Sequence, residues 1–194
     1  MKLIQAVASI LAVSVLSVKV VPLAWANLQP QKVHTIAQVN SGVLETVPAI
    51  TIGEIQAINR EVEAVIDQGD VKGVLEFMAP FIISETITAS VNGFESAHIE
   101  GIEQHREMLT NVFNEADTEE NLNVQEISQK ETIRITPDGQ LATALISTVN
   151  EVTTGDELRL ITTTDTIRFA RLQGQIKVIS YTTDSQITSH DLQE

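Results

Sequence analysis

The segment ELRLITTTDTIRFARLQGQIKVISYTTD, residues 157–184, decides the fold that we expect for this chain. Two runs rich in β-branched and aromatic residues, which favour strands, flank a break at Leu172-Gln173-Gly174. Two such runs around a short glycine-containing turn are typical of a β-hairpin. We therefore predict two long antiparallel strands here.

Two more strand-like runs precede this hairpin, so the C-terminal half is predicted to be an antiparallel meander. Turn residues separate the runs, because Pro presets one backbone angle and Gly permits a positive one. The turns are Pro137-Asp138-Gly139, Thr154-Gly155-Asp156 and Gln173-Gly174, and the strands are residues 122–135, 141–152, 158–170 and 175–187.

Helices are expected in the N-terminal half. Thr51-Ile52-Gly53-Glu54 has the pattern of a capping box, which predicts a helix from this point to about Gln68. Asp70 is a suitable cap for a second helix, which Pro80 would close. A hairpin around Asn92-Gly93 and a third helix over residues 101–114 should follow. Together with the meander, these elements predict an α+β fold in which three helices cover one face of a curved antiparallel sheet.

The outer face of this sheet also carries apolar residues. On the third strand of the meander, Ile161, Ile167 and Phe169 alternate with apolar residues of the opposite side, Leu158, Leu160 and Ala170. A solvated face would be polar throughout. We therefore expect a second buried surface, covered either by the segment before Thr51 or by a second copy of the chain, and we predict a homodimer through the outer sheet face.

The N-terminus resembles a secretory signal peptide. Lys2 precedes an apolar run from Leu3 to Val18, and Ala24-Trp25-Ala26 has the small-x-small form of a cleavage site. Because Lys19 interrupts the run, it is shorter than the roughly 20 residues of a spanning helix. We predict cleavage after Ala26, a linker or arm over residues 27–50, one domain over 51–187 and a tail over 188–194.

Charge and composition narrow the classes of partner. Residues 1–26 contain two lysines and no acid, so the exported chain would keep 10 basic and 26 acidic residues, a net charge of −16. This field repels phosphate backbones and anionic lipid, which disfavours nucleic acid and membrane surfaces as partners. The chain has no cysteine, so thiol chemistry and lipid attachment after the apolar run are excluded. We expect a periplasmic or secreted protein without a membrane anchor after cleavage.

The order of elements and several short motifs resemble the NTF2-like superfamily, in particular its SnoaL-like and DUF4440-type branches. The resemblance covers about residues 52–185, and its markers are Gln68-Gly69-Asp70, Gly101-Ile102-Glu103, the Thr164–Phe169 segment, Gly174-Gln175-Ile176, Tyr181 and Asp184. It implies a conical pocket between the sheet and the helices. One fold of this kind supports many functions, from isomerases and dehydratases to association modules.

Six residues are candidates for the pocket that the resemblance implies: His105, Met108, Leu109, Asp165, Phe169 and Tyr181. His105 interrupts the apolar stripe of the third predicted helix, where it could serve as acid, base or ligand, or be a core histidine bonded to a backbone carbonyl. Asp165 could enter the pocket as a base with a raised pKa, or pair with Arg168 or Arg171 at the rim of the sheet. Tyr181 could orient a ligand or simply pack in the core.

The sequence favours binding over catalysis. Superfamily enzymes with proton-transfer activity place an acid, or a tyrosine and an aspartate together, near the end of the first strand. In this chain only Glu85 is acidic there, and it comes early. His98 and Glu103 lack the spacing of a metal site, no phosphate loop is present, and we predict no metal and no cofactor. The first hypothesis is an exported, non-catalytic module for a small apolar ligand or a protein. The alternative is a cofactor-independent isomerase, dehydratase or cyclase, with Asp165 as base and His105 or Tyr181 polarising a carbonyl.

Overall fold

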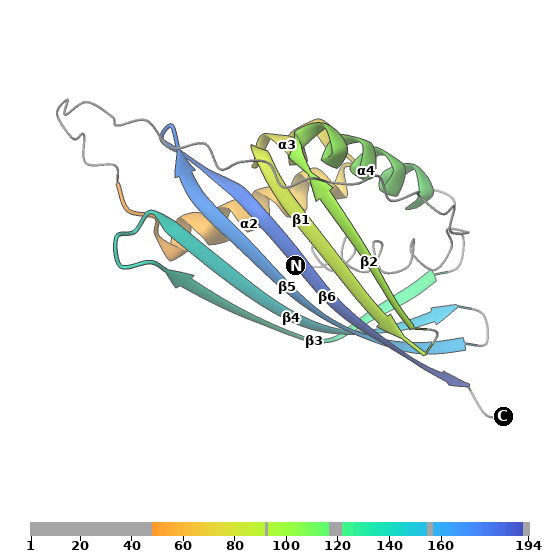
Figure 1. Cartoon of the computed structure of the whole chain (residues 1–194). Coiled ribbons are helices and arrows are strands. Elements are labelled where there is room, and N and C mark those ends of the chain that lie inside the picture. Colours follow the sequence, from red (N-terminus) through yellow and green to blue (C-terminus); the bar gives the residue numbers. More distant parts are fainter. Residues whose placement is uncertain (1–47, 92, 117–121, 155–156, 192–194) are drawn as a thin grey trace, which may run out of the picture.

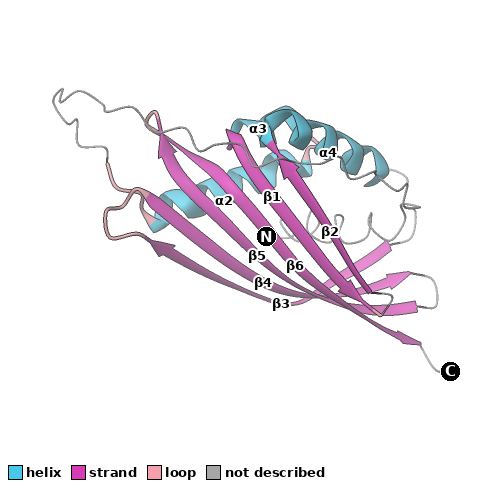
Figure 2. Cartoon of the chain, viewed as in Figure 1, coloured by secondary structure: helices cyan, strands magenta, loops and turns pink. Residues whose placement is uncertain are grey.

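The computed structural model describes residues 48–91, 93–116, 122–154 and 157–191. Within these ranges one curved sheet is accompanied by three helices (Figures 1 and 2). The helices are α2 (Ile52–Asp67), α3 (Val71–Glu76) and α4 (Gly101–Ala116). The strands are β1 (Met78–Ser90), β2 (Gly93–Glu100), β3 (Leu122–Ile135), β4 (Leu141–Thr154), β5 (Glu157–Leu172) and β6 (Gln175–Asp191). The proposed cleavage site and nearly all of the arm lie outside the described residues.

The sheet is mixed, which corrects the prediction of a purely antiparallel one. The order of its six strands is β2-β1-β6-β5-β4-β3, and β1 pairs with β6 in parallel, with Ser84 opposite Tyr181. The other neighbours are antiparallel, as predicted for the two hairpins and the meander. A parallel pair needs a long crossover connection, here α4 with the meander, and local turn motifs do not specify it.

Caps define the first two helices as predicted at their N-termini. The Thr51 hydroxyl accepts a hydrogen bond from the Glu54 amide (3.2 Å), and the Glu54 carboxylate accepts one from the Thr51 amide (2.9 Å). The Asp70 carboxylate likewise caps α3. The expected end of α3 at Pro80 is wrong, because α3 ends at Glu76 and Pro80 belongs to β1. Proline is tolerated at such an irregular strand start, where the register between β1 and β6 shifts.

Two apolar clusters join the helices to the sheet. Ile55 of α2 is fully buried and belongs to a cluster with residues of β4 and β5: Ala142, Ala144, Ile146, Ile167 and Phe169. A second cluster joins the three helices through Ile66, Val74, Leu75 and Leu109. Burial of a side chain of this size contributes about 1.5–3 kcal/mol, so these clusters hold the helices against the sheet.

The inner sheet face becomes polar in its middle. Along β5 every second residue from Ile161 to Phe169 is buried, and two of these, Thr163 and Asp165, are polar. Neighbouring strands contribute more buried polar side chains in the same two rows, Thr88, Thr148, Thr183 and Ser185, and Asn150 lies in the next row, opposite Ile161. Beyond this band Val152, Ile161 and Ile187 form a third apolar cluster.

Described residues on either side of the expected domain, residues 51–187, also pair with it. Ile50 is 2% exposed, and its amide donates to the Gly139 carbonyl (2.8 Å), while β6 continues to Asp191. Gly139 adopts a positive φ of 70°, and a Cβ there would meet Ala49, so glycine is needed at this close approach. No helix in the described ranges is long and apolar enough to span a bilayer.

Candidate functional site

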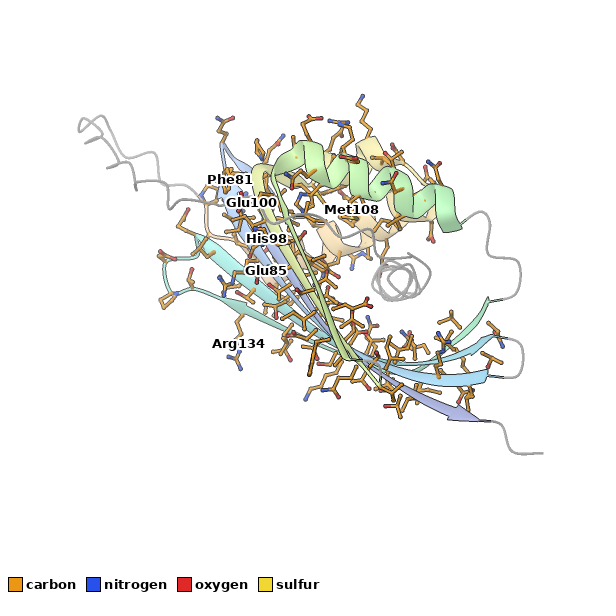
Figure 3. The ribbon with its side chains drawn as sticks, turned by 45° about the vertical axis from the view of Figure 1, so that its right-hand side comes forward. Phe81, Glu85, His98, Glu100, Met108 and Arg134 are labelled. Atoms are coloured by element: carbon orange, nitrogen blue, oxygen red, sulfur yellow. The ribbon has the colours of Figure 1, made fainter. Side chains whose placement is uncertain are left out.

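An apolar cavity of about 120 Å³ lies between the helices and the inner face of the sheet. Met108, on the side of α4 that is turned towards the sheet, is one of its walls (Figure 3). Apolar lining residues come from seven elements: Ile58, Val62, Ile66, Val74, Met78, Ile82, Ile99, Met108, Leu109, Ile167, Phe169 and Val178. The polar lining residues are Asn59, Ser84, Thr86, His105 and Tyr181.

His105 is fixed in the wall of this cavity by hydrogen bonds from both ring nitrogens. Nδ1 lies 2.7 Å from the Gly101 carbonyl oxygen, and Nε2 lies 2.9 Å from the Ser84 hydroxyl. A carbonyl oxygen can only accept, so Nδ1 carries a proton, and in the neutral ring Nε2 accepts from Ser84. The ring is 1% exposed. The bond to Gly101 is the kind expected of a core histidine, and the bond to Ser84 adds a pair of polar groups at the cavity.

Asp165 lies behind Tyr181 and is not part of the cavity wall. Its Oδ1 accepts two hydrogen bonds, one from the Tyr181 hydroxyl (2.7 Å) and one from the Thr183 hydroxyl (2.8 Å). Register explains the cluster, because Asp165 faces Thr183 directly across the β5–β6 pair and Tyr181 comes two residues before Thr183 on the same face of β6. Only Tyr181 reaches the cavity, so any influence of Asp165 on a ligand passes through this hydroxyl.

Burial shifts the pKa values of both Asp165 and Tyr181. It raises the pKa of the Asp165 carboxyl above its ordinary value, an effect that the hydrogen bonds from Tyr181 and Thr183 oppose and the nearby charge of Asp184 increases. Burial, together with the charge of Asp165, raises the pKa of the Tyr181 hydroxyl well above its ordinary value. Tyr181 is therefore a neutral hydrogen-bonding group at physiological pH.

Five of the six candidate residues line the cavity: His105, Met108, Leu109, Phe169 and Tyr181. Asp165 is attached to this set through Tyr181. The sequence-based reasoning missed Ser84, since a serine in a strand carries no signal until its neighbour in space is known. Thr183, whose hydroxyl donates a hydrogen bond to Asp165, was not among the candidates either. The only signal for this contact in the sequence was that an aspartate and a threonine lie in two strands predicted to pair.

A separate group of titratable residues lies on the outer face of β1 and β2. His98 is placed between two carboxylates, with Nδ1 3.4 Å from Glu85 and Nε2 2.9 Å from Glu100 (Figure 3). The hydrogen bond to Glu100, with the charges of both glutamates, raises the pKa of His98 against a smaller opposing effect of burial. Glu103 instead pairs with Arg106. Among the residues that the structure describes, no group of three or more side chains is arranged to hold a metal ion.

No family model matches the chain, and no curated protein matches it. Solved structures do resemble it. A putative scytalone dehydratase from Novosphingobium aromaticivorans has a TM-score of 0.50 at 8% identity, covering 74% of this chain and 88% of that one. An NTF2-like protein of unknown function from Pseudomonas putida has a TM-score of 0.46 at 16% identity, covering 68% and 84%.

A putative calcium/calmodulin dependent protein kinase II association domain from Xanthomonas campestris has a TM-score of 0.49 at 12% identity, covering 78% of this chain and 97% of that one. At such identities a structural likeness speaks for the fold alone, since one fold hosts many activities. The curved sheet with its helices and the likeness to the putative scytalone dehydratase confirm the fold that the resemblance predicted from the sequence: the chain has the NTF2-like fold.

Proposed function

We propose that this NTF2-like domain is a non-catalytic module whose cavity binds a small apolar molecule. The observation that carries the proposal is that polar groups in the cavity wall are hydrogen-bonded to other groups of the protein. Ser84 and His105 bond each other, and the Tyr181 hydroxyl donates to Asp165. These groups already have protein partners, and the remaining wall is mainly apolar, so the favourable interaction left for a ligand is burial of apolar surface.

The volume of the cavity limits the size of the ligand. At about 120 Å³ it is below the roughly 300 Å³ at which drug-sized pockets begin. Apolar cavities of about 150 Å³ in other proteins stay dry and bind benzene. The proposed ligand is therefore benzene-sized, or it is an acyl or isoprenoid chain that inserts only one end.

Thermal unfolding with benzene and toluene as probes tests this proposal. A ligand at 100 times its Kd stabilises the native state by about 2.7 kcal/mol, so the Tm should rise with probe concentration. Val62→Phe, which adds an aromatic ring to the wall, should abolish the rise. Ile87→Phe on the outer face is the matched control and should keep it. A flat Tm in the wild type, or an equal rise in all three proteins, would contradict the proposal.

A second candidate is supported by the shifted pKa of Asp165. A carboxyl with a raised pKa is suited to act as the base in proton abstraction next to a carbonyl group. Because Asp165 does not line the cavity, the proton would reach it through the Tyr181 hydroxyl, which would take up the substrate proton and pass its own proton to Asp165. Exchange of the α-hydrogens of cyclohexanone in D₂O, followed by NMR, tests this alternative. It requires exchange above the buffer rate in the wild type and its loss in Asp165→Asn. Equal rates in the wild type and in buffer would exclude cyclohexanone-type chemistry.

The export of the protein is part of the proposal, and it rests on the sequence of residues 1–26. N-terminal sequencing of the protein from its native cell envelope should give Asn27 as the first residue. A chain that retains the first 26 residues would contradict cleavage.

A further inference from the structure

The buried polar groups of the cavity wall are linked by hydrogen bonds that run in one direction. The Gly101 carbonyl oxygen can only accept, so its contact of 2.7 Å with Nδ1 fixes the proton of the neutral His105 ring on that nitrogen. Nε2 of the same ring is then an acceptor, and the Ser84 hydroxyl, 2.9 Å away, donates to it. The single proton of Ser84 is therefore directed at His105 and not at the space inside the cavity.

Ser84 keeps the capacity to accept a hydrogen bond. A hydroxyl oxygen carries two lone pairs in addition to its proton, and donation to Nε2 of His105 uses neither of them. Ser84 lines the cavity and is 7% exposed. This pair therefore offers an acceptor, and no donor, to a molecule inside the cavity.

The Tyr181 hydroxyl is also committed as a donor. Its proton is donated to Oδ1 of Asp165 over 2.7 Å, on the side away from the cavity. A ligand acceptor could take the proton of Ser84 or Tyr181 only by breaking a bond within the protein. That would leave a buried acceptor without its donor, which costs more free energy than the new hydrogen bond contributes.

The two other polar residues of the wall are closer to solvent. Asn59 and Thr86 are partly exposed, whereas Ser84 and His105 are buried. Water can bond to groups that solvent reaches, so such groups discriminate little between a ligand that donates and one that accepts. Discrimination should therefore depend mainly on the buried Ser84–His105 pair.

We propose that the cavity selects small neutral molecules that carry one N–H or O–H donor, such as an alcohol, a phenol or a pyrrole. The donor bonds Oγ of Ser84 and extends the chain of hydrogen bonds through His105 to Gly101. A molecule of the same size with only an acceptor, such as a pyridine or a ketone, would bury its polar atom without a partner, which lowers its affinity. This inference rests on the proposed function, the binding of a small apolar molecule, and adds the one polar group that the ligand should carry.

Pyrrole and pyridine are matched probes for this preference, and benzene is the reference without a hydrogen-bonding group. Pyrrole has one donor and no ring acceptor, whereas pyridine, in a buffer that keeps it neutral, has one acceptor and no donor. Isothermal titration calorimetry of the purified full-length protein measures the Kd of each probe. The wild type should bind pyrrole about fivefold or more tightly than pyridine, the factor expected of one net hydrogen bond.

Three variants test the origin of the preference. His105→Leu removes the acceptor of the Ser84 proton, so Ser84 can donate to pyridine or accept from pyrrole, and the two Kd values should come within about twofold of each other. Ser84→Ala leaves Nε2 of His105 as the acceptor at the cavity, so the preference for pyrrole should persist. His98→Leu is the matched control on the outer face, where His98 contacts Glu85 and Glu100, and should change neither Kd.

The outcomes separate this inference from the proposed function. A wild type that binds benzene without preferring pyrrole, or a full preference that survives in His105→Leu, would overturn the inference and leave the proposed function standing. Loss of the preference in Ser84→Ala would also overturn it, because Nε2 of His105 would then not be the acceptor. The wild type and Ser84→Ala decide the matter even if His105→Leu does not fold, which circular dichroism checks. Failure of all three probes to bind the wild type would contradict the proposed function and this inference together.

Discussion

The Tyr181 hydroxyl donates a hydrogen bond of 2.7 Å to Oδ1 of Asp165, and this bond joins the cavity wall to a buried carboxyl group. Asp165 is 1% exposed. It accepts a second hydrogen bond from the hydroxyl of Thr183, which lies on β6, as Tyr181 does. Two neutral donors stabilise a carboxylate less than a cation would, so burial still dominates its protonation. A substitution at Asp165 or Tyr181 is therefore expected to change both the polarity of the cavity wall and the stability of the sheet.

Asp165→Asn should leave the protein at least as stable as the wild type at pH 7. The amide oxygen can accept both hydrogen bonds, and the variant no longer buries a charge, which is costly without a cationic partner. Burial raises the native pKa of Asp165 above its ordinary value of 3.8. The protonated Asp165 carboxyl therefore makes its full contribution to the free energy of unfolding below about pH 3.8. This contribution is lost as the pH rises through the raised native pKa. Urea unfolding from pH 4 to 7 should show this loss in the wild type and not in Asp165→Asn. A variant destabilised by more than about 2 kcal/mol at pH 7 would argue for an ionised, well-stabilised carboxylate.

Tyr181→Phe should raise the pKa of Asp165 further. Among the effects that lower this pKa, the hydrogen bond from Tyr181 is the largest, and the variant removes it while keeping the ring in the cavity wall. A ¹³C NMR titration of the aspartate carboxyl signals in the wild type and the variant measures the change. Thr183→Val is the matched variant for the second donor and should shift the pKa in the same direction by less. An unchanged Asp165 pKa in Tyr181→Phe would mean that the hydrogen bond does not persist in solution.

Glu54→Gln should destabilise the domain by about 1 kcal/mol, with the effect confined to pH values where Glu54 is ionised. The Arg171 guanidinium donates a hydrogen bond to Glu54 (2.8 Å). This bond, and to a smaller extent the one from Thr51, lowers the Glu54 pKa from its ordinary value of 4.5. Its contribution is therefore present above about pH 4.5 and is lost as the pH falls through the lowered native pKa. Acid unfolding of both proteins measures it. Glu61→Gln, on the exposed face of the same helix, should change stability by less than about 0.5 kcal/mol. Equal acid midpoints for wild type and Glu54→Gln would contradict a role for this pair.

Local signals in the sequence predicted much of the fold. The capping box at Thr51, the cap at Asp70 and the turn at Gln173-Gly174 lie where their motifs predict, because each depends on contacts within a few residues. The parallel pairing of β1 with β6 was not predicted, since it joins strands that are distant in sequence. The end of α3 was misplaced because pairing of Met78 with Val178 overrides the local helical pattern.

The candidate site was predictable to the same degree. His105 and Tyr181 were identified because each is unusual in an otherwise apolar or strand-forming context. Ser84 and Thr183 were not identified, because each matters through one contact that is distant in sequence. Ser84 bonds His105 of α4, and Thr183 bonds Asp165 of the neighbouring strand.

The central claim, an apolar cavity that accepts a small molecule, is tested most directly by the methyl signals of methionine. Of the three methionines in the chain, Met78 and Met108 line the cavity, so both report on its contents in a protein labelled at the methionine methyl carbon. Titration with toluene should move both signals along a saturable curve, and Val62→Phe should remove that response. Signals of Met78 and Met108 that stay in place at saturating toluene would contradict the claim.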